Sequence, residues 1–136
     1  MRIVVTGGTG LIGRPLVASL LADGHEVVVL SRNPEKRRST MPSNVILDRC
    51  DGETLGDWAS HVDGADAVIN FAGEGIAGDS FLPDRWTADK KRRIRDSRLD
   101  AGRIVVEAIQ AAADKPRLLI QASAVGYYGP RGDEIV

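Results

Sequence analysis

The chain has 136 residues, of which 43% are apolar and 27% are charged, as in one soluble globular domain. Its 18 lysines and arginines against 19 aspartates and glutamates give a formal net charge of −1, which excludes the basic excess of a nucleic-acid-binding domain. One cysteine excludes an internal disulfide, and no apolar run reaches the ~18 residues of a membrane span, so we expect a cytoplasmic protein without a membrane partner.

Strand-like and helix-like segments alternate along the chain. Apolar runs predict strands at residues 3–6, 25–30, 44–48, 65–71 and 118–122. Helical patterns occupy residues 11–22, 54–61 and 87–113, and residues 33–38 predict a short exposed helix or a loop. Continuous apolar strands that alternate with helices indicate a parallel sheet buried on both faces.

The first strand leads into a glycine-rich turn with the sequence Thr6-Gly-Gly-Thr-Gly-Leu-Ile-Gly13. We expect Gly7 to form a tight turn, Gly10 to let a pyrophosphate approach the backbone, and Gly13 to let the helix pack close to the strand. The N-terminus of the following helix would face the phosphates with free N–H groups. Strand, turn and helix together predict a dinucleotide site; the alternative is a turn that binds nothing. The predicted cofactor-binding residues here are Gly7, Thr9, Gly10, Leu11, Ile12 and Gly13.

The element order and this turn define the fold class as α/β, with a Rossmann-type doubly wound parallel sheet in the strand order 3-2-1-4-5. Residues 1–136 would form one NAD(P)-binding domain. A full doubly wound fold has six strands, whereas this chain offers five and stops in the loop after the fifth. We therefore expect the N-terminal part of a longer protein, without the last strand or strands and the substrate domain.

The end of the second strand indicates which dinucleotide binds. A carboxylate there would hydrogen-bond the ribose 2′-hydroxyl and favour NAD. The chain has Ser31 and Arg32 instead, whose hydroxyl and guanidinium can donate to a 2′-phosphate. We therefore predict both as cofactor-binding residues and NADP as the cofactor; in the less favoured NAD alternative, Arg32 is a solvated surface charge. Lys36, Arg37 and Arg38 are interpreted as a solvated face.

The fourth strand ends in Asn70-Phe-Ala-Gly73. Small residues at the carboxyl end of a strand let a cofactor lie across it, so Asn70, Phe71, Ala72 and Gly73 are predicted to bind the cofactor. Asn70 could instead tie down its own loop. Asp51, which follows the third strand, is interpreted as a surface-loop residue rather than an adenine contact.

The fifth strand is followed by Ser123, with Tyr127 and Tyr128 close behind. The Ser123 hydroxyl could polarise a substrate carbonyl, and the Tyr127 phenol could donate a proton if a nearby cation lowered its pKa. Ser123 and Tyr127 are therefore the catalytic candidates. His25 and His61 have no partners at metal-ligand spacing, so we predict no metal.

Three motifs together resemble the extended short-chain dehydrogenase/reductase superfamily: the glycine turn, the end of the fourth strand and Ser123-Ala-Val-Gly-Tyr-Tyr-Gly129. The stretch Trp86-Thr-Ala-Asp-Lys-Lys-Arg-Arg-Ile-Arg-Asp-Ser-Arg98 narrows the resemblance to an atypical, epimerase-like subgroup whose substrate is not established. The resemblance covers nearly the whole chain. It implies an NAD(P)-dependent fold with a C-terminal substrate part and a Ser or Thr, a Tyr and a Lys that act together.

The chain departs from this catalytic pattern. Neither Tyr127 nor Tyr128 is followed four residues later by a lysine, so the Tyr-x-x-x-Lys pair of the superfamily does not occur. An ungapped alignment places the superfamily's serine position at Ala124, and a one-residue insertion brings Ser123 into it. The resemblance therefore implies cofactor binding more firmly than it implies catalysis.

The long helical segment carries an apolar stripe that we expect to face the core: Leu99, Ile104, Val105, Ala108, Ile109 and Ala112. In related enzymes the equivalent helix often forms a dimer face, so the resemblance suggests a homodimer.

Two classes of function remain. One is the NADP(H)-binding part of an epimerase/dehydratase-like or oxidoreductase enzyme of unknown substrate, with this chain alone inactive. The other is a non-catalytic NADP(H)-sensing regulatory protein.

Overall fold

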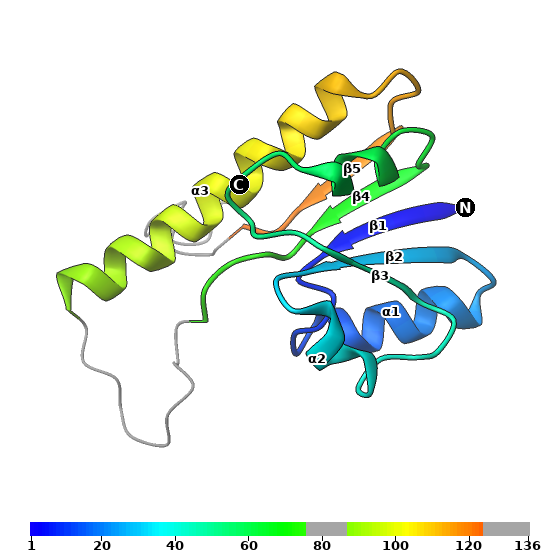
Figure 1. Ribbon diagram of the computed structural model, residues 1–136, viewed down its shortest axis with the longest axis horizontal. Coiled ribbons are helices and arrows are strands. Elements are labelled where there is room, and N and C mark those ends of the chain that lie inside the picture. The colour runs from blue at the N-terminus through cyan, green and yellow to red at the C-terminus, as the bar shows by residue number, and fades with distance from the viewer. Residues whose placement is uncertain (76–86, 124–136) are drawn as a thin grey trace, which may run out of the picture.

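The computed structural model describes residues 1–75 and 87–123. In chain order its elements are β1 (Arg2–Thr6), α1 (Gly13–Ala22), β2 (Glu26–Ser31), α2 (Pro34–Arg38), β3 (Ile46–Arg49), the 3-10 helix η1 (Asp57–His61), β4 (Ala67–Asn70), α3 (Ala88–Ala111) and β5 (Leu118–Gln121) (Figure 1). The strands form one parallel sheet in the order β3-β2-β1-β4-β5. The predicted α/β, Rossmann-type fold and its strand order are confirmed.

Element ends differ from the prediction by a few residues where local hydrogen bonds decide them. The predicted third strand starts late because the Val45 N–H donates to the Pro42 carbonyl at 3.3 Å, which makes this segment a turn. The predicted helix at 54–61 is only the short η1. The long helix begins after Thr87, whose hydroxyl accepts the Lys90 N–H at 3.2 Å and so caps the first turn.

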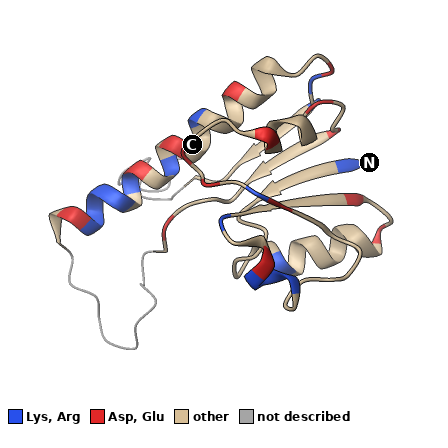
Figure 2. Ribbon diagram, viewed as in Figure 1, with Lys and Arg blue, Asp and Glu red and all other residues tan. Residues whose placement is uncertain are grey.

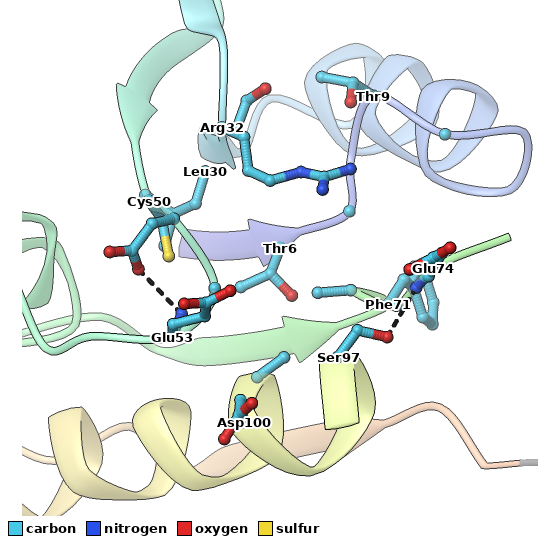
Figure 3. A pocket seen from close by; sticks show the side chains of 18 of the residues that line it. Thr6, Thr9, Leu30, Arg32, Cys50, Glu53, Phe71, Glu74, Ser97 and Asp100 are labelled. Carbon is cyan, nitrogen blue, oxygen red and sulfur yellow. Dashed lines mark hydrogen bonds between the residues drawn. The ribbon is translucent and has the colours of Figure 1, made fainter. Parts of the chain in front are cut away.

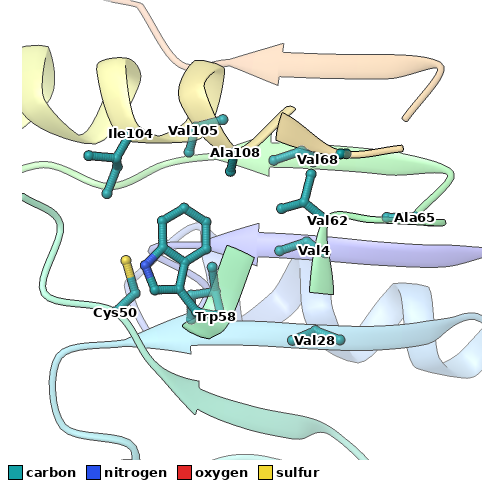
Figure 4. Packing of buried hydrophobic residues seen from close by; sticks show 12 residues of the cluster. Val4, Val28, Cys50, Trp58, Val62, Ala65, Val68, Ile104, Val105 and Ala108 are labelled. Atoms are coloured by element: carbon teal, nitrogen blue, oxygen red, sulfur yellow. The ribbon is translucent and has the colours of Figure 1, made fainter. Parts of the chain in front are cut away.

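Alternate residues of the central strands enter two separate cores. On one face, Val4 of β1 pairs with Val28 of β2 and Val68 of β4, and all three valines are almost completely buried. Ile104, Val105 and Ala108 of α3 and Trp58 and Val62 at η1 cover this face (Figure 4). The other face is covered by α1, which packs Val17 with Leu16, Leu20 and Leu21 against the strands. Each fully buried Val or Ile stabilises the fold by ~1.5–3 kcal/mol.

The apolar stripe of α3 was only partly predicted. Ile104 is 1% exposed, whereas Leu99 is 63% exposed and does not face the core. Five residues correspond to about 140° around a helix axis, so these two side chains point to different sides. The buried stripe instead runs through Ala101, Ile104, Val105 and Ala108, at helical spacing.

The expectation that every strand is buried on both faces is wrong for β5. All four of its residues are exposed, including Leu118, Leu119 and Ile120. The reason is its position: β5 is one of the two edge strands and pairs only with β4. The other edge strand, β3, has no fully buried residue either. In the described part of the chain, no helix is long and apolar enough to cross a membrane.

Candidate functional site

A cleft of about 570 Å³ opens at the carboxyl ends of β1, β2 and β4 (Figure 3). This volume lies within the ~300–1,000 Å³ of small-molecule sites. The cleft lies where the strand order reverses, because β1 has β2 on one side and β4 on the other. Open α/β sheets bind their ligands at this kind of position.

Eight of the predicted cofactor-binding residues line the cleft, namely Gly7, Thr9, Gly10, Ser31, Arg32, Phe71, Ala72 and Gly73. The other four, Leu11, Ile12, Gly13 and Asn70, are not part of its wall. The sheet thus brings together three segments that are far apart in the sequence: the glycine turn, the end of β2 and the end of β4.

The glycine turn has the geometry expected of it at Gly7. This residue has φ +69°, in the left-handed region, and its carbonyl accepts the Gly10 N–H at 3.0 Å. A Cβ on Gly7 would lie 2.6 Å from the carbonyl carbon and oxygen of Phe71. The turn therefore lies directly against the backbone that follows β4.

Two further glycines make close contacts around the turn. A Cβ on Gly13 would collide with the backbone of Gly7 and Gly8, so Gly13 lets the start of α1 pack against the residues that directly follow β1. Gly8, which the sequence analysis did not select, is buried, and a Cβ there would lie 2.9 Å from Val29 of β2.

The N-terminus of α1 has no side-chain cap. Ile12 is the N-cap residue, no side chain bonds to the helix N-terminus there, and the first turn contains no acidic residue. Leu11 is 94% exposed and lies outside the cleft wall. The Arg14 N–H already donates to the Gly10 carbonyl at 3.1 Å and Pro15 has no N–H, so an anion beside the Gly7–Gly10 turn would meet the partial positive charge of the helix end and the N–H groups that precede Arg14.

Two arginines line the cleft at the end of β2. The Arg32 side chain extends toward the glycine turn beside Thr9 (Figure 3), and the Ser31 hydroxyl accepts the Asn33 N–H at 3.3 Å. Arg37 also lines the cleft, although the sequence analysis assigned it to a solvated face. Arg37 belongs to the short helix α2, whose start at Pro34 the Asn33-Pro34 sequence indicated.

Asp51 also lines the cleft, but its carboxylate is used within its own loop. It accepts hydrogen bonds from the Thr54 hydroxyl, from the Thr54 N–H at 2.9 Å and from the Glu53 N–H at 2.8 Å. These bonds, the Thr54 hydroxyl first, lower the pKa of Asp51 to about 2. The neighbouring Cys50 thiol has a raised pKa because it is buried.

Asn70 acts as a link between strands. It is 0% exposed, and its Oδ1 accepts the Thr6 hydroxyl of β1 and the Ala72 N–H at 3.1 Å. Its Nδ2 donates to Gln121 Oε1 of β5 at 2.8 Å. Of the two roles considered for Asn70, the structure shows the one that ties down the loop.

One wall of the cleft was not predicted from the sequence. It comes from α3 and consists of Arg92, Arg93, Asp96, Ser97, Asp100 and Ala101. These positions recur every three to four residues, which is the spacing of one helix face. This spacing could be read from the sequence, but the helix was considered for its apolar stripe, its family motif and a dimer face, and not as a wall of the cleft. Figure 2 shows lysines and arginines gathered along the first half of α3.

The catalytic candidates are not brought to the cleft by the described residues. Ser123 is exposed and does not belong to the cleft wall, and Tyr127 lies outside the described residues. Within residues 1–75 and 87–123, no three His, Cys, Asp or Glu side chains form a group that could hold a metal ion.

The sequence matches the NAD dependent epimerase/dehydratase family over residues 3–135. The chain belongs to this family. Epimerase family protein YfhF of Bacillus subtilis is 40% identical over 131 residues, which are 95% of this chain and 39% of that protein. The chloroplastic epimerase family protein SDR39U1 homolog of Arabidopsis thaliana is 37% identical over 95% of this chain and 36% of its own length. The chain thus spans well under half of these family members.

Two solved structures share the fold. The structure of human epimerase family protein SDR39U1 with NADPH superposes with a TM-score of 0.74 at 31% identity, over 96% of this chain and 39% of that one. A UDP-glucose 4-epimerase from Stenotrophomonas maltophila with bound NAD has a TM-score of 0.73 at 23% identity and covers 99% of this chain and 40% of that one. Both likenesses agree with the parallel sheet described above.

Proposed function

We propose that this chain is the NADP(H)-binding portion of a cytoplasmic enzyme of the epimerase/dehydratase family. The choice of NADP rests on the positively charged side chains at the end of the cleft beside β2. Arg32 and Arg37 both line the cleft there, and β2 ends in Ser31 rather than in a carboxylate. A 2′-phosphate would find guanidinium donors at this end, whereas the ribose of NAD would find no carboxylate acceptor at the end of β2.

The rest of the cleft fits the remaining parts of a dinucleotide. The pyrophosphate would lie at the glycine turn, beside the uncapped N-terminus of α1. The adenosine half would lie over β2 and the nicotinamide half over β4, beside Phe71, Ala72 and Gly73. When bound, the nicotinamide supplies hydride transfer.

The carboxylates of the cleft are compatible with a 2′-phosphate at Arg32. Asp51 is engaged by Thr54. Glu53 lies nearer α3 in Figure 3, and its carbonyl accepts a hydrogen bond from Arg103 of α3 at 2.7 Å. The negative charge of Asp51 is therefore engaged within its own loop, and the Glu53 backbone is tied to α3.

The human relative whose structure contains NADPH supports the same cofactor. In the whole protein, Ser123 and Tyr127 remain the candidates for polarising a carbonyl and donating a proton. No observation specifically favours the non-catalytic regulator, so the enzyme is the function that we propose.

The experiment is a calorimetric titration of the purified protein with NADPH and with NADH. We expect tighter binding of NADPH, and we expect Arg32→Asp to erase or reverse this preference because a carboxylate repels a 2′-phosphate and accepts from a 2′-hydroxyl. Lys36→Asp is the control, since it makes the same charge change at an exposed position outside the cleft wall. Equal affinities of the wild-type protein for both cofactors would refute the proposal.

A further inference from the structure

The segment that follows β4 is held in place by side chains of α3. The Glu74 N–H donates to Ser97 Oγ at 2.9 Å (Figure 3), and Arg98 Nη1 donates to the Glu74 carbonyl at 3.1 Å. Both backbone polar groups of Glu74 are thus bonded to two consecutive residues of one helix. Arg93 Nε adds an ion pair with Glu74 Oε1 at 3.2 Å.

The two holding side chains are themselves fixed on α3. The Ser97 hydroxyl donates to the Ile94 carbonyl at 3.1 Å, and Arg98 Nη1 donates to the same carbonyl at 2.9 Å. A side chain that is anchored to its own helix has already lost rotamer freedom before it binds the loop. Ser97 and Arg98 therefore present a rigid surface to the loop.

Gly73 lies directly on the Arg98 side chain. A Cβ on Gly73 would be 3.1 Å from Arg98 Cγ and 3.2 Å from Cζ. Gly73, Glu74 and Ser97 belong to the cleft wall, whereas Arg98 does not. Arg98 therefore acts on the cleft from behind the loop, and only through it.

We propose that Ser97 and Arg98 are positioning residues that hold residues 73–74 in the shape required by the nicotinamide half of the cofactor. The inference rests on the proposed function, because it uses the same cleft. The loop belongs to the β4 half of the cleft, and Arg32 and Arg37 lie at the β2 half. Loss of either positioning residue thus weakens the binding of a whole dinucleotide and leaves the binding of its adenosine half unchanged.

The test is to titrate the full-length protein with NADPH and with 2′,5′-ADP, which contains the adenosine half and its 2′-phosphate but no nicotinamide. For Ser97→Ala and Arg98→Met we expect NADPH affinity to fall about tenfold, or ~1.4 kcal/mol, as for one lost hydrogen bond. Affinity for 2′,5′-ADP should stay within about twofold of the wild-type value. Ser97→Thr retains the hydroxyl and should restore most of the NADPH affinity.

Lys91→Met is the matched control, because Lys91 is an exposed cation on the same helix and lies outside the cleft wall. Amide hydrogen exchange adds a measurement that needs no ligand: the Glu74 amide should exchange faster in Ser97→Ala than in the wild-type protein. Unchanged NADPH affinity, equal weakening of both ligands, or an unchanged Glu74 exchange rate would each overturn the inference. A wild-type protein that binds neither ligand would refute the proposed function itself.

Discussion

Gly7 combines two constraints that can be separated by mutation. Its backbone is left-handed at φ +69°, and the Phe71 backbone occupies the space where a Cβ would lie. Gly24 is also left-handed, at φ +78°, but has no heavy atom within 4 Å of a Cβ. The two glycines therefore form a matched pair in which only Gly7 meets a steric obstacle.

We predict that Gly24→Ala costs ~1–2 kcal/mol of unfolding free energy, the usual penalty of a left-handed alanine. Gly7→Ala should cost clearly more, because the turn must also move away from Phe71. Urea unfolding of both variants measures the difference. Equal losses of unfolding free energy in the two variants would mean that the loop after β4 moves aside without cost when a Cβ is added to Gly7.

Asp51 offers a prediction about pH. Its pKa is lowered to about 2, first by the Thr54 hydroxyl, so its hydrogen bonds favour the ionised carboxylate in the folded protein. This stabilisation is present above the ordinary pKa of 3.8 and is lost as the pH falls through about 2. In Thr54→Val we expect the Asp51 pKa to rise toward 3.8, measured by NMR titration of its carboxyl carbon. An unmoved pKa would assign the shift to the backbone N–H groups alone.

At the scale of elements, the predictable features were those that depend on local sequence. Apolar runs located the strands of the sheet, and the glycine turn located the start of α1. The orientation of α3 was harder, because Leu99 and Ile104 are equally apolar and only the helix phase separates them. Leu99 was wrongly assigned to the buried face because Leu99 and Ile104, five positions apart, were counted as lying on one face of the helix.

The two sides of α3 give a direct comparison of core and surface. We predict that Ile104→Ala costs ~2–5 kcal/mol of unfolding free energy, because it leaves a cavity against β1, β4 and Trp58. Leu99→Ala should stay within about 0.5 kcal/mol of the wild-type value, as expected at an exposed position. Denaturant unfolding measures both variants; a similar cost at Leu99 would indicate that this side chain is buried in an assembly.

At the scale of the whole molecule, the candidate site could be predicted only in part. The sequence motifs supplied the residues at the ends of β1, β2 and β4, because each follows its own strand directly. The α3 wall and the hydrogen bonds from Ser97 and Arg98 to Glu74 depend on how a helix packs across the sheet. The spacing of the α3 residues marks one helix face, but it does not tell that this face borders the cleft, so their place in the site was found only in the structure.

The central position of β1 has a consequence for the order of folding. Arg2 pairs with Glu26 of the next strand, whereas the other edge of β1 pairs Ile3 with Ala67 of β4, much later in the chain. Closing the longer loop costs more chain entropy, so we expect β1 and β2 to associate before β4 arrives. During synthesis on the ribosome, the half of the cleft at the end of β2 would thus form first, and the half at the end of β4 only when β4 pairs with β1.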